Sequence, residues 1–324
     1  MPQIAVTEIY ETSRKALSNH GAAPWVAEEV AKAVARAEAL GNIICGLYYL
    51  ESYCIQLKSG RVDGNVAPDV QTLRPGFIKS DARFGFAQPA FTRALPTALE
   101  AAKTNGTATL AVAHAHTCTS LGYFTEQIAQ AGFIAIGFTN ASPIVAPPGG
   151  KTRVIGTNPI SMAVPGPGAP VMQFDFSTSA VALGKITMAK AAGEQIPLGW
   201  AGDENGQPTT DPDAALQGSL VSTGGYKGWG FGLMGEVMAA ALTGSVNSLD
   251  VGGLKLPDGP PHGLGQTYLI LDPTVSPDFA VRMARVIDAV EAQEGARIPG
   301  AHRTAMEEVD VPDSLWSLAL RLSA

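Results

Sequence analysis

Residues 137–165 read GFTNASPIVAPPGGKTRVIGTNPISMAVP, a turn-rich and charge-poor segment between two apolar runs. Glycine and proline at this density fix the shape of the backbone rather than fill a core. A flexible linker would carry more charge. The hydroxyl and amide side chains of Thr157 and Asn158 are free to face whatever the backbone approaches. The stretch therefore predicts a shaped loop over a small-molecule site.

The composition bounds the class of protein. The chain has 324 residues, of which 46% are apolar and 16% are charged, and its formal net charge is −7. This length predicts two or three subdomains, and the low charge content favours a homo-oligomer. No cluster of Lys and Arg occurs, which argues against nucleic acid or an anionic membrane as a partner. The N-terminus has no apolar signal core, and no apolar run is long enough to span a membrane.

The three cysteines are scattered along the chain, at Cys45, Cys54 and Cys118. Such spacing gives no disulfide framework and suits a reducing compartment. We therefore expect a cytoplasmic protein.

Periodicity and turn residues predict a mixed α/β (α+β) fold, with a central sheet and helical N- and C-terminal regions. The expected helices are 6–19, 24–40, 90–104, 120–131, 179–192, 229–243, 276–293 and 312–322. The expected strands are 107–115, 133–139, about 160–165 and 171–176, and the expected irregular spans are 59–75, 193–227 and 244–268.

Three regions follow from this pattern. Residues 1–65 are expected to form a helical region joined by the C-terminal helices of 275–324. Residues 70–200 are expected to form the sheet and the cofactor-binding region. Residues 201–274 are expected to be Gly-rich loops around the strongly apolar helix 229–243, which is predicted to be buried.

A dinucleotide fingerprint can be found, but it lacks its structural context. Gly230, Gly232 and Gly235 fit G-x-G-x-x-G, and Asp250 follows 20 residues after Gly230. A Rossmann phosphate loop must follow a strand and open a helix. These glycines instead lie inside an apolar helix, so the sequence predicts a non-Rossmann fold.

Two histidines end the predicted strand 107–115. A spacing of two would put His114 and His116 on one face. No third ligand of the right kind lies nearby, so we expect no metal site. The two rings could simply be satisfied by backbone carbonyls, or they could donate protons in a cleft at the strand end. The next residues, TCTSLG, could hold a phosphate through backbone N–H groups and the hydroxyls of Thr117, Thr119 and Ser120.

Charged side chains in uncharged, Gly-rich settings suggest an anion site. Lys185, Lys227 and Arg303 stand in ALGKI, GGYKGWG and IPGAHR. Each could be merely solvated, but three such cations favour an anionic ligand. Asp175, in FDFSTS, either caps the following helix or takes part in the site.

Several motifs, in one order, resemble the type-2 malate/L-lactate dehydrogenase family, which includes ureidoglycolate and sulfolactate dehydrogenases and Δ1-piperideine-2-carboxylate reductases. The motifs are TNASPIVAPPGGKTRVIGTNPISMAVP, FDFSTSAVALGKITMAKAAGEQIPLGWAGDENGQPTTDP, GGYKGWGFGLMGEVMAAALTG and RIPGAHR. The match is dense over 107–244, recurs at 297–303, and extends weakly to AEALG at 37–41 and SGRV at 59–62.

The resemblance implies a homodimer that binds NADPH or NADH in a non-Rossmann fold. It implies hydride transfer to or from C2 of a small 2-oxo, 2-hydroxy or cyclic 2-imino acid. Arg303 could meet a 2′-phosphate, which favours NADPH. The positions that match cofactor-binding segments of the family are Thr117, Cys118, Thr119, Ser120, Leu121, Thr157, Asn158, Asp175, Phe176, Ser177, Leu183, Gly184, Tyr226, Lys227, His302 and Arg303.

The chain departs from the family near its N-terminus. Where such proteins carry Ser-His-Gly and then a basic residue, this chain has Ile44, Cys45, Gly46 and Tyr49. In the imine-reducing branch of the family an Asp completes the proton relay, and this chain has Lys185 at that position. The proton relay and the carboxylate contact therefore cannot be carried over. Our candidates for catalysis are His116, Tyr48 and Lys185, and for substrate binding Cys45, Tyr49 and His114.

Three functions are compatible with these motifs. The first is an NAD(P)H-dependent oxidoreductase acting on a small carboxylated substrate. The second is a dinucleotide-binding protein that has lost catalysis, since the usual relay is missing. The third is a non-redox lyase or epimerase on the same scaffold, with Cys45 or Tyr48 as base.

Overall fold

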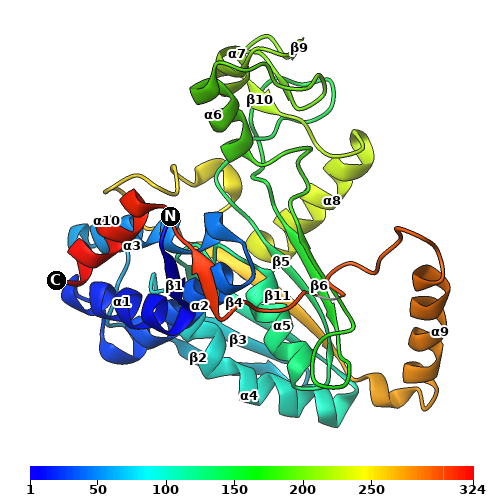
Figure 1. Cartoon of the computed structure of the whole chain (residues 1–324). Coiled ribbons are helices and arrows are strands. Elements are labelled where there is room, and N and C mark those ends of the chain that lie inside the picture. The colour runs from blue at the N-terminus through cyan, green and yellow to red at the C-terminus, as the bar shows by residue number, and fades with distance from the viewer. Residues whose placement is uncertain (302) are drawn as a thin grey trace.

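The computed structural model describes residues 1–301 and 303–324. Helices from both ends of the chain pack together around one apolar cluster (Figure 1). The terminal strands β1 and β12 pair antiparallel, which brings the two ends of the chain side by side. The elements of this region are β1 Gln3–Ala5, α1 Val6–Asn19, α2 Pro24–Ala39, η1 Ile43–Cys45, η2 Leu47–Tyr49, α3 Leu50–Ser59, β12 Glu308–Asp310 and α10 Asp313–Ser323.

The helix α2 shows why helices in this region could be predicted from end signals and apolar spacing. Pro24 stands at its first turn, where its missing N–H costs nothing. Val26, Val30 and Val34 recur at helical spacing and are all buried in the shared cluster. The helices predicted at 6–19, 24–40 and 312–322 are confirmed to within one or two residues.

The centre of the molecule is a seven-stranded mixed sheet in the order β2-β3-β4-β11-β5-β6-β7. Strands β3 and β4 pair in parallel, and the other neighbouring pairs of this sheet are antiparallel. The strands are β2 Asp69–Arg74, β3 Phe77–Asp81, β4 Thr107–Ala115, β5 Ile134–Thr139, β6 Ile160–Val164, β7 Met172–Phe176 and β11 Leu264–Leu271.

The middle strand of this sheet was missed by the sequence prediction. Residues 244–268 were expected to be loop, whereas β11 begins at Leu264 and lies between β4 and β5. Polar residues inside the strand hid its pattern. Gln266 and Thr267 are fully buried, and the Thr267 hydroxyl donates to the carbonyl of Met238. The hairpin β2–β3 was also missed, because its first strand is exposed and begins inside the expected irregular span 59–75.

The two faces of the sheet are covered by different helices. Tyr268 of β11 points to α4 Ala87–Asn105 and α5 Gly122–Gln130, where it contacts Phe91 and Phe124. The neighbouring Thr267 faces the π-helical turn η3 Val237–Ala241 on the other side. This alternation fixes the register of β11 between the two layers.

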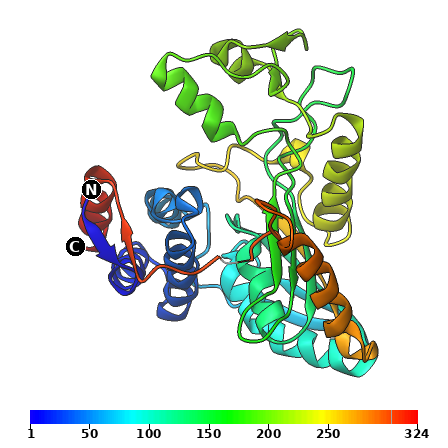
Figure 2. The same ribbon diagram turned by 45° about the vertical axis from the view of Figure 1, so that its right-hand side comes forward.

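A third, smaller lobe stands above the sheet (Figures 1 and 2). It holds its own apolar cluster around Ile186 and Ile196. The span 193–227, expected to be irregular, contributes three very short strands to it. The elements are α6 Leu183–Ala192, β8 Ala201–Gly202, β9 Pro208–Thr209, α7 Pro212–Gln217 and β10 Ser219–Leu220.

The helix expected at 229–243 forms, but it is not buried. It consists of α8 Tyr226–Glu236, which continues into η3. Phe231 is 55% exposed and Val237 is 58% exposed, so the prediction of burial is wrong for the single chain. Its small residues do face inward: a Cβ on Gly232 would lie 2.5 Å from Ile155.

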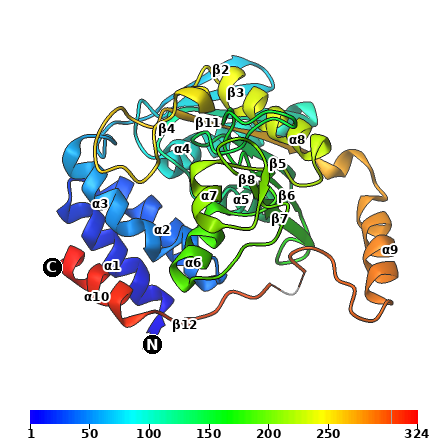
Figure 3. The ribbon, with the colours of Figure 1, turned by 90° about the horizontal axis from the view of Figure 1, so that it is seen from above.

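The helix α9 Phe279–Glu291 projects away from the body (Figures 1 and 3). It has no buried residue, and it contributes nothing to the cluster that α10 joins. The two remaining short elements are η4 Ser248–Asp250 and η5 Pro273–Val275. The division into three regions stays a prediction.

Candidate active site

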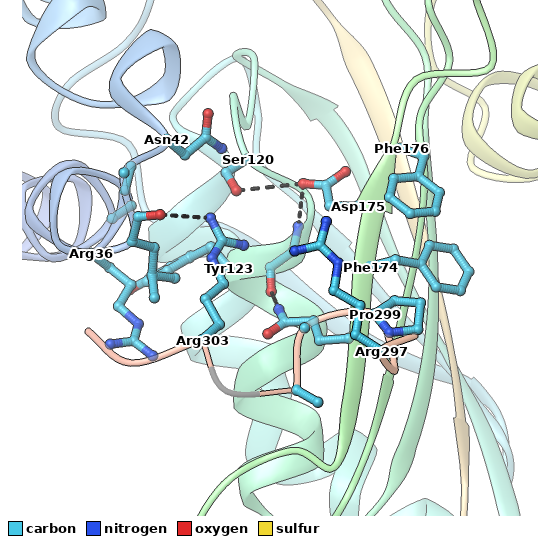
Figure 4. Close-up of a pocket in the computed structure, with 18 residues that line it drawn as sticks. Arg36, Asn42, Ser120, Tyr123, Phe174, Asp175, Phe176, Arg297, Pro299 and Arg303 are labelled. Atoms are coloured by element: carbon cyan, nitrogen blue, oxygen red, sulfur yellow. Dashed lines mark hydrogen bonds between the residues drawn. The ribbon is translucent and has the colours of Figure 1, made fainter. Parts of the chain in front are cut away.

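A cleft of about 920 Å³ lies between the end of α2, the start of α5, strand β7 and residues 297–301 and 303 (Figure 4). Its volume falls in the range of small-molecule and cofactor sites, roughly 300–1,000 Å³. Ser120, Asp175, Phe176 and Arg303, all predicted to bind cofactor, line it together. The cleft therefore joins segments that lie far apart in the sequence.

Asp175 is the acidic group of this cleft. Its Oδ2 accepts the N–H of Gly122 at 2.7 Å and faces the Ser120 hydroxyl at 3.5 Å. Asp175 therefore interacts with the start of α5, not with the start of the helix that follows it in sequence. Burial raises the pKa of its carboxyl, while the Gly122 and Ser120 hydrogen bonds and Arg303 oppose that rise.

Three arginines line the same cleft, and they differ in their partners. Arg36 is tied to Glu126 of α5 by two hydrogen bonds. Arg303 donates to the carbonyl of Leu40 at 2.9 Å. Within the described residues, neither Arg303 nor Arg297 has a carboxylate partner at ion-pair distance. These two guanidinium groups could neutralise a phosphate.

The altered stretch 44–49 is held in place by a buried acid that the sequence did not single out. Glu38 of α2 accepts the N–H of Leu47 at 2.7 Å. A Cβ on Gly46 would lie only 2.2 Å from Oε1 of Glu38, so any larger residue there would have to displace this buried carboxyl. Burial raises the pKa of Glu38 against the lowering effect of the Leu47 N–H.

The side chains of this stretch are neutral. Burial, with a smaller contribution from Asp175, raises the pKa of the Cys45 thiol to about 12. Burial likewise raises the pKa of Tyr49 to about 12. Tyr48 is exposed, and the Nζ of Lys255 lies 3.2 Å from the centre of its ring. Lys255 also lies 4.5 Å from the ring centre of Tyr49, a contact that no motif in the sequence predicts.

His116 lies deep in the protein, with only 2% of its surface exposed. Its Nε2 is 2.6 Å from the Oε1 of Gln56 in α3. Its ring stacks on His262 with a centroid distance of 4.1 Å. Burial, His262 and Arg61 lower the pKa of His116 well below its ordinary value. Gln56, Arg61 and His262 were not predicted as site residues, because each comes from a segment remote from residue 116. Arg61 lies in the weakly matching SGRV, and no motif surrounds the other two.

His114 is separated from this cluster. Its Nδ1 lies 3.0 Å from Asp81, and its Nε2 lies 3.0 Å from the carbonyl of Gly244. A positive φ of 49° at His114 breaks the strand alternation, so the two histidines contact different partners. Both ring nitrogens of His114 therefore have partners within the protein, and its role in substrate binding stays a prediction.

The segment 117–121 lies between His116 and the cleft. The Thr117 N–H donates to Nδ1 of His262 at 3.2 Å. Cys118 and Leu121 are buried in the core cluster under the sheet, so they could meet a ligand only through their backbone. Thr119 adopts a positive φ of 60°. Ser120 is the one whose side chain lines the cleft.

The remaining predicted residues lie toward the upper lobe. Asn158 is fully buried, and its Nδ2 donates to the Gly232 carbonyl and to Glu236, which ties the loop to α8. Its role in cofactor binding stays a prediction. The carbonyl of Thr157 accepts from Thr178. Exposed positions at the starts of α6 and α8 hold Leu183, Gly184, Lys185, Tyr226 and Lys227.

One contact relates the upper lobe to the altered stretch. A Cβ on Gly184 would lie 3.9 Å from Ile44, so the start of α6 faces η1. Ser177 is hydrogen-bonded to Ser179. His302 was also predicted to bind cofactor and lies outside the described residues.

No group of three or more potential ligands able to hold a metal ion occurs in residues 1–301 and 303–324. Over the same part of the chain, no helix combines the length and apolar character needed to cross a bilayer.

Comparisons with known proteins agree on one family. The family model for malate/L-lactate dehydrogenase matches residues 4–315. The chain is 36% identical over 318 residues to a (2R)-3-sulfolactate dehydrogenase (NADP(+)) of Chromohalobacter salexigens, covering 96% of this chain and 95% of that protein. It is 33% identical over 335 residues to a Δ1-pyrroline-2-carboxylate/Δ1-piperideine-2-carboxylate reductase of Pseudomonas aeruginosa, covering 99% of both chains.

A solved structure gives the same answer. The crystal structure of Δ1-piperideine-2-carboxylate reductase from Pseudomonas syringae pv. tomato superposes with a TM-score of 0.90 at 29% identity, covering 99% of this chain and 100% of that one. The resemblance and the mixed α/β fold predicted from the sequence are confirmed. The chain belongs to the malate/L-lactate dehydrogenase family.

Proposed function

We propose that this protein is an NAD(P)H-dependent oxidoreductase that transfers hydride to or from C2 of a small 2-oxo, 2-hydroxy or cyclic 2-imino acid. The observation that carries the proposal is the cleft in which Asp175, Arg297 and Arg303 meet beside the altered stretch. Its relatives include an NADP(+)-dependent dehydrogenase and imino-acid reductases.

The cleft residues suit a dinucleotide. Arg297 and Arg303 would hold phosphate, and Asp175 and Ser120 would accept or donate hydrogen bonds to hydroxyl groups. When bound, the nicotinamide supplies the hydride acceptor or donor. The two guanidinium groups favour the extra phosphate of NADPH over NADH.

His116 is the group that we assign to proton transfer. Its lowered pKa keeps it neutral near pH 7, so it is ready to accept the hydroxyl proton of a 2-hydroxy acid. Tyr53 lies between the rings of His116 and Tyr49, with centroid distances of 5.5 and 5.7 Å, which links His116 to the altered stretch. Tyr49 stays a protonated phenol and is the second candidate donor.

A cation is needed for the substrate carboxylate. Lys185 follows Gly184 at the start of α6, and its side chain is exposed. Lys255 is better placed, because its ammonium group already lies on the rings of Tyr48 and Tyr49 and has no carboxylate partner in the described part of the chain. We therefore favour Lys255 over Lys185 for this contact.

The lyase or epimerase alternative finds little support. A thiol whose pKa is raised to about 12 is not a base near pH 7, which removes Cys45 from that role. A dinucleotide-binding protein without catalysis remains the second candidate, because Ile44 and Cys45 carry no proton relay.

We infer a homodimer for the assembly. The exposed apolar face of α8 and the projecting helix α9 present large apolar surfaces to solvent in the single chain, including Phe231, Val237 and Val286. Three free cysteines suit a cytoplasmic location.

The test of this function has two steps. Thermal shift with NADPH and with NADH measures cofactor binding. The absorbance of the reduced nicotinamide is then followed with Δ1-piperideine-2-carboxylate, Δ1-pyrroline-2-carboxylate, pyruvate and sulfolactate. Turnover of any of these supports the proposal. Absence of cofactor binding would overturn it, and cofactor binding without any turnover would favour the binding protein.

The role of His116 is tested by His116→Ala. We expect single-turnover hydride transfer to fall by roughly 10²–10⁴-fold, the usual contribution of a general acid or base. Unchanged cofactor affinity would show that the fold is intact. An unchanged rate of hydride transfer would remove His116 from the mechanism.

A further inference from the structure

Gln56 is a fully buried amide whose hydrogen bonds fix its orientation. Its Nε2 donates to the carbonyl of Leu254 at 2.9 Å and to the carbonyl of Leu256 at 2.7 Å. Turning the amide over would place its oxygen against these two carbonyl oxygens. The oxygen of Gln56 must therefore face Nε2 of His116, at 2.6 Å.

This orientation settles which nitrogen of His116 carries the proton. An amide oxygen only accepts hydrogen bonds, so Nε2 of His116 must be the donor. In the neutral ring the lone pair is then on Nδ1. That atom is buried and has no hydrogen-bond partner within the described residues. A buried acceptor left without a partner is costly unless something else, such as a substrate, supplies one.

The groups around His116 keep its ring neutral. His262 stacks on one face, Arg61 adds a nearby positive charge, and the rings of Tyr53 and Phe86 pack against the remaining sides. None of these groups is an acid, and a backbone hydrogen bond with Thr117 opposes the lowering of the pKa of His116 without reversing it. Gln56 is thus the one polar side chain to which His116 is hydrogen-bonded in the described part of the chain.

We propose that Gln56 is a positioning residue that reserves Nδ1 of His116 for proton exchange with the substrate. This inference rests on the proposed function. In the oxidation of a 2-hydroxy acid, Nδ1 of His116 would accept the hydroxyl proton, and a bound oxidised nicotinamide would supply the acceptor for the hydride from C2. The products would be the 2-oxo acid, the reduced nicotinamide and an imidazolium that still donates Nε2–H to Gln56. Reduction runs through the same atoms in reverse.

The same amide links His116 to the loop 253–260. Arg61 donates to the carbonyls of Gly253, Leu256 and Pro260, and Ser59 donates to the carbonyl of Pro257. Of these three anchoring side chains, Gln56 is the one that is also hydrogen-bonded to His116 in the described structure. Displacement of the loop 253–260 would therefore let the Gln56 amide turn over, and His116 would no longer be restricted to one tautomer.

Two variants and one control test the proposal in the full-length protein. Gln56→Met keeps the size of the side chain and removes all three hydrogen bonds. Gln56→Glu keeps an acceptor for Nε2–H and places a negative charge beside the ring. Ser59→Ala removes one loop anchor, at Pro257, and leaves the contact with His116 intact.

The first readout needs no turnover. Nitrogen-15 spectra of the histidine side chains, with His116 assigned by its loss in His116→Ala, should show Nε2–H in the wild type and in Ser59→Ala. Gln56→Met should show a mixture of tautomers. A wild-type ring protonated on Nδ1, or no change in Gln56→Met, would overturn the proposal whether or not the protein proves to be an oxidoreductase.

The second readout is the pH profile. Gln56→Met should lower kcat for oxidation by about tenfold or more, with the cofactor KM unchanged. Gln56→Glu should move the acidic limb to higher pH by about one unit or more, because its carboxylate stabilises the imidazolium. Ser59→Ala should match the wild type. Equal profiles for the wild type and Gln56→Glu would count against the assignment, whereas loss of cofactor binding by the wild type would count against the proposed function.

Discussion

Gly46 is the point at which the altered stretch meets the helix that supports it. Any side chain there would collide with Glu38, whose carboxylate also holds the N–H of Leu47. Backbone packing thus explains why Gly46 stands here, whereas the resemblance implies that the side chains beside it differ from those usual in the family.

We predict that Gly46→Ala destabilises the protein by about 1–3 kcal/mol, because Glu38 must move and release the Leu47 N–H. Urea unfolding measures this. Gly76→Ala is the control, since its new Cβ would meet only ordinary contacts, the nearest at 3.5 Å. Equal midpoints for the two variants would contradict the packing argument.

The buried histidine His262 makes the free energy of unfolding depend on pH in the acid range. Burial and Arg61 lower the pKa of His262 to about 3 in the folded protein, while the unfolded chain titrates near 6.5. Between these values the unfolded state binds more protons, so stability is full above pH 6.5 and falls as the pH drops toward 3. Where the folded and unfolded pKa values of a group differ by one, the free energy of unfolding changes by about 1.4 kcal/mol.

We therefore expect His262→Asn to flatten the dependence of the free energy of unfolding on pH between about 6.5 and 4. The variant should lose stability at pH 7, through lost packing and the weakened Thr117 contact, and should gain relative to the wild type as the pH falls. Urea unfolding at four pH values compares the slopes. Parallel slopes would show that His262 titrates normally in the folded state.

At the scale of elements, residues 297–301 and 303, which we call the strap, line one side of the cleft. The strap lies between α9 and β12 and brings Arg297 and Arg303 over strand β7 (Figure 4). The Gln173 N–H donates to the carbonyl of Pro299, and a Cβ on Gly300 would lie 2.4 Å from the carbonyl of Gln173. Close backbone contact therefore fixes the strap and the two guanidinium groups with it.

Arg297→Ala should weaken NADPH binding by about tenfold and leave NADH binding unchanged, because only NADPH carries the extra phosphate. Titration calorimetry with both cofactors measures the ratio. Arg36→Ala is an informative comparison, since Arg36 lines the same cleft but is tied to Glu126. A parallel loss of NADPH and NADH affinity in Arg297→Ala would assign it to the pyrophosphate instead.

The success of sequence reasoning differed between elements for physical reasons. Helices α1 and α2 were predicted because one apolar stripe and clear end signals define each of them. Strand β11 was missed because Gln266 and Thr267 interrupt its apolar pattern, and their contacts with Tyr268 and the Met238 carbonyl cannot be read from a strand pattern. The cleft residues were found through the family motifs. Gln56 and Lys255 were not, since their partners become visible only once the loop 253–260 is folded back onto α3.

At the scale of the whole molecule, the apolar surface of α8 and α9 is the largest unexplained feature of the single chain. Phe231→Asp should convert the expected dimer to single chains of 33.5 kDa, because a charge at the centre of an apolar interface is strongly unfavourable. Light scattering after size exclusion measures the mass. Leu198→Asp, at a position that is also exposed but lies in the upper lobe, should leave it unchanged.

The place of β11 in the sheet has a consequence for how the chain folds. Residues 264–271 separate β4 from β5, which are neighbours in sequence order but not in the sheet. During synthesis, β2-β3-β4 and β5-β6-β7 therefore emerge as two unjoined half-sheets, and their inner edges stay open until residue 271 has left the ribosome. Joining the half-sheets requires β11 to pair with β4, some 150 residues earlier in the chain. Contacts this distant in sequence predict slow folding. They also predict an aggregation-prone intermediate that lasts until β11 docks between β4 and β5.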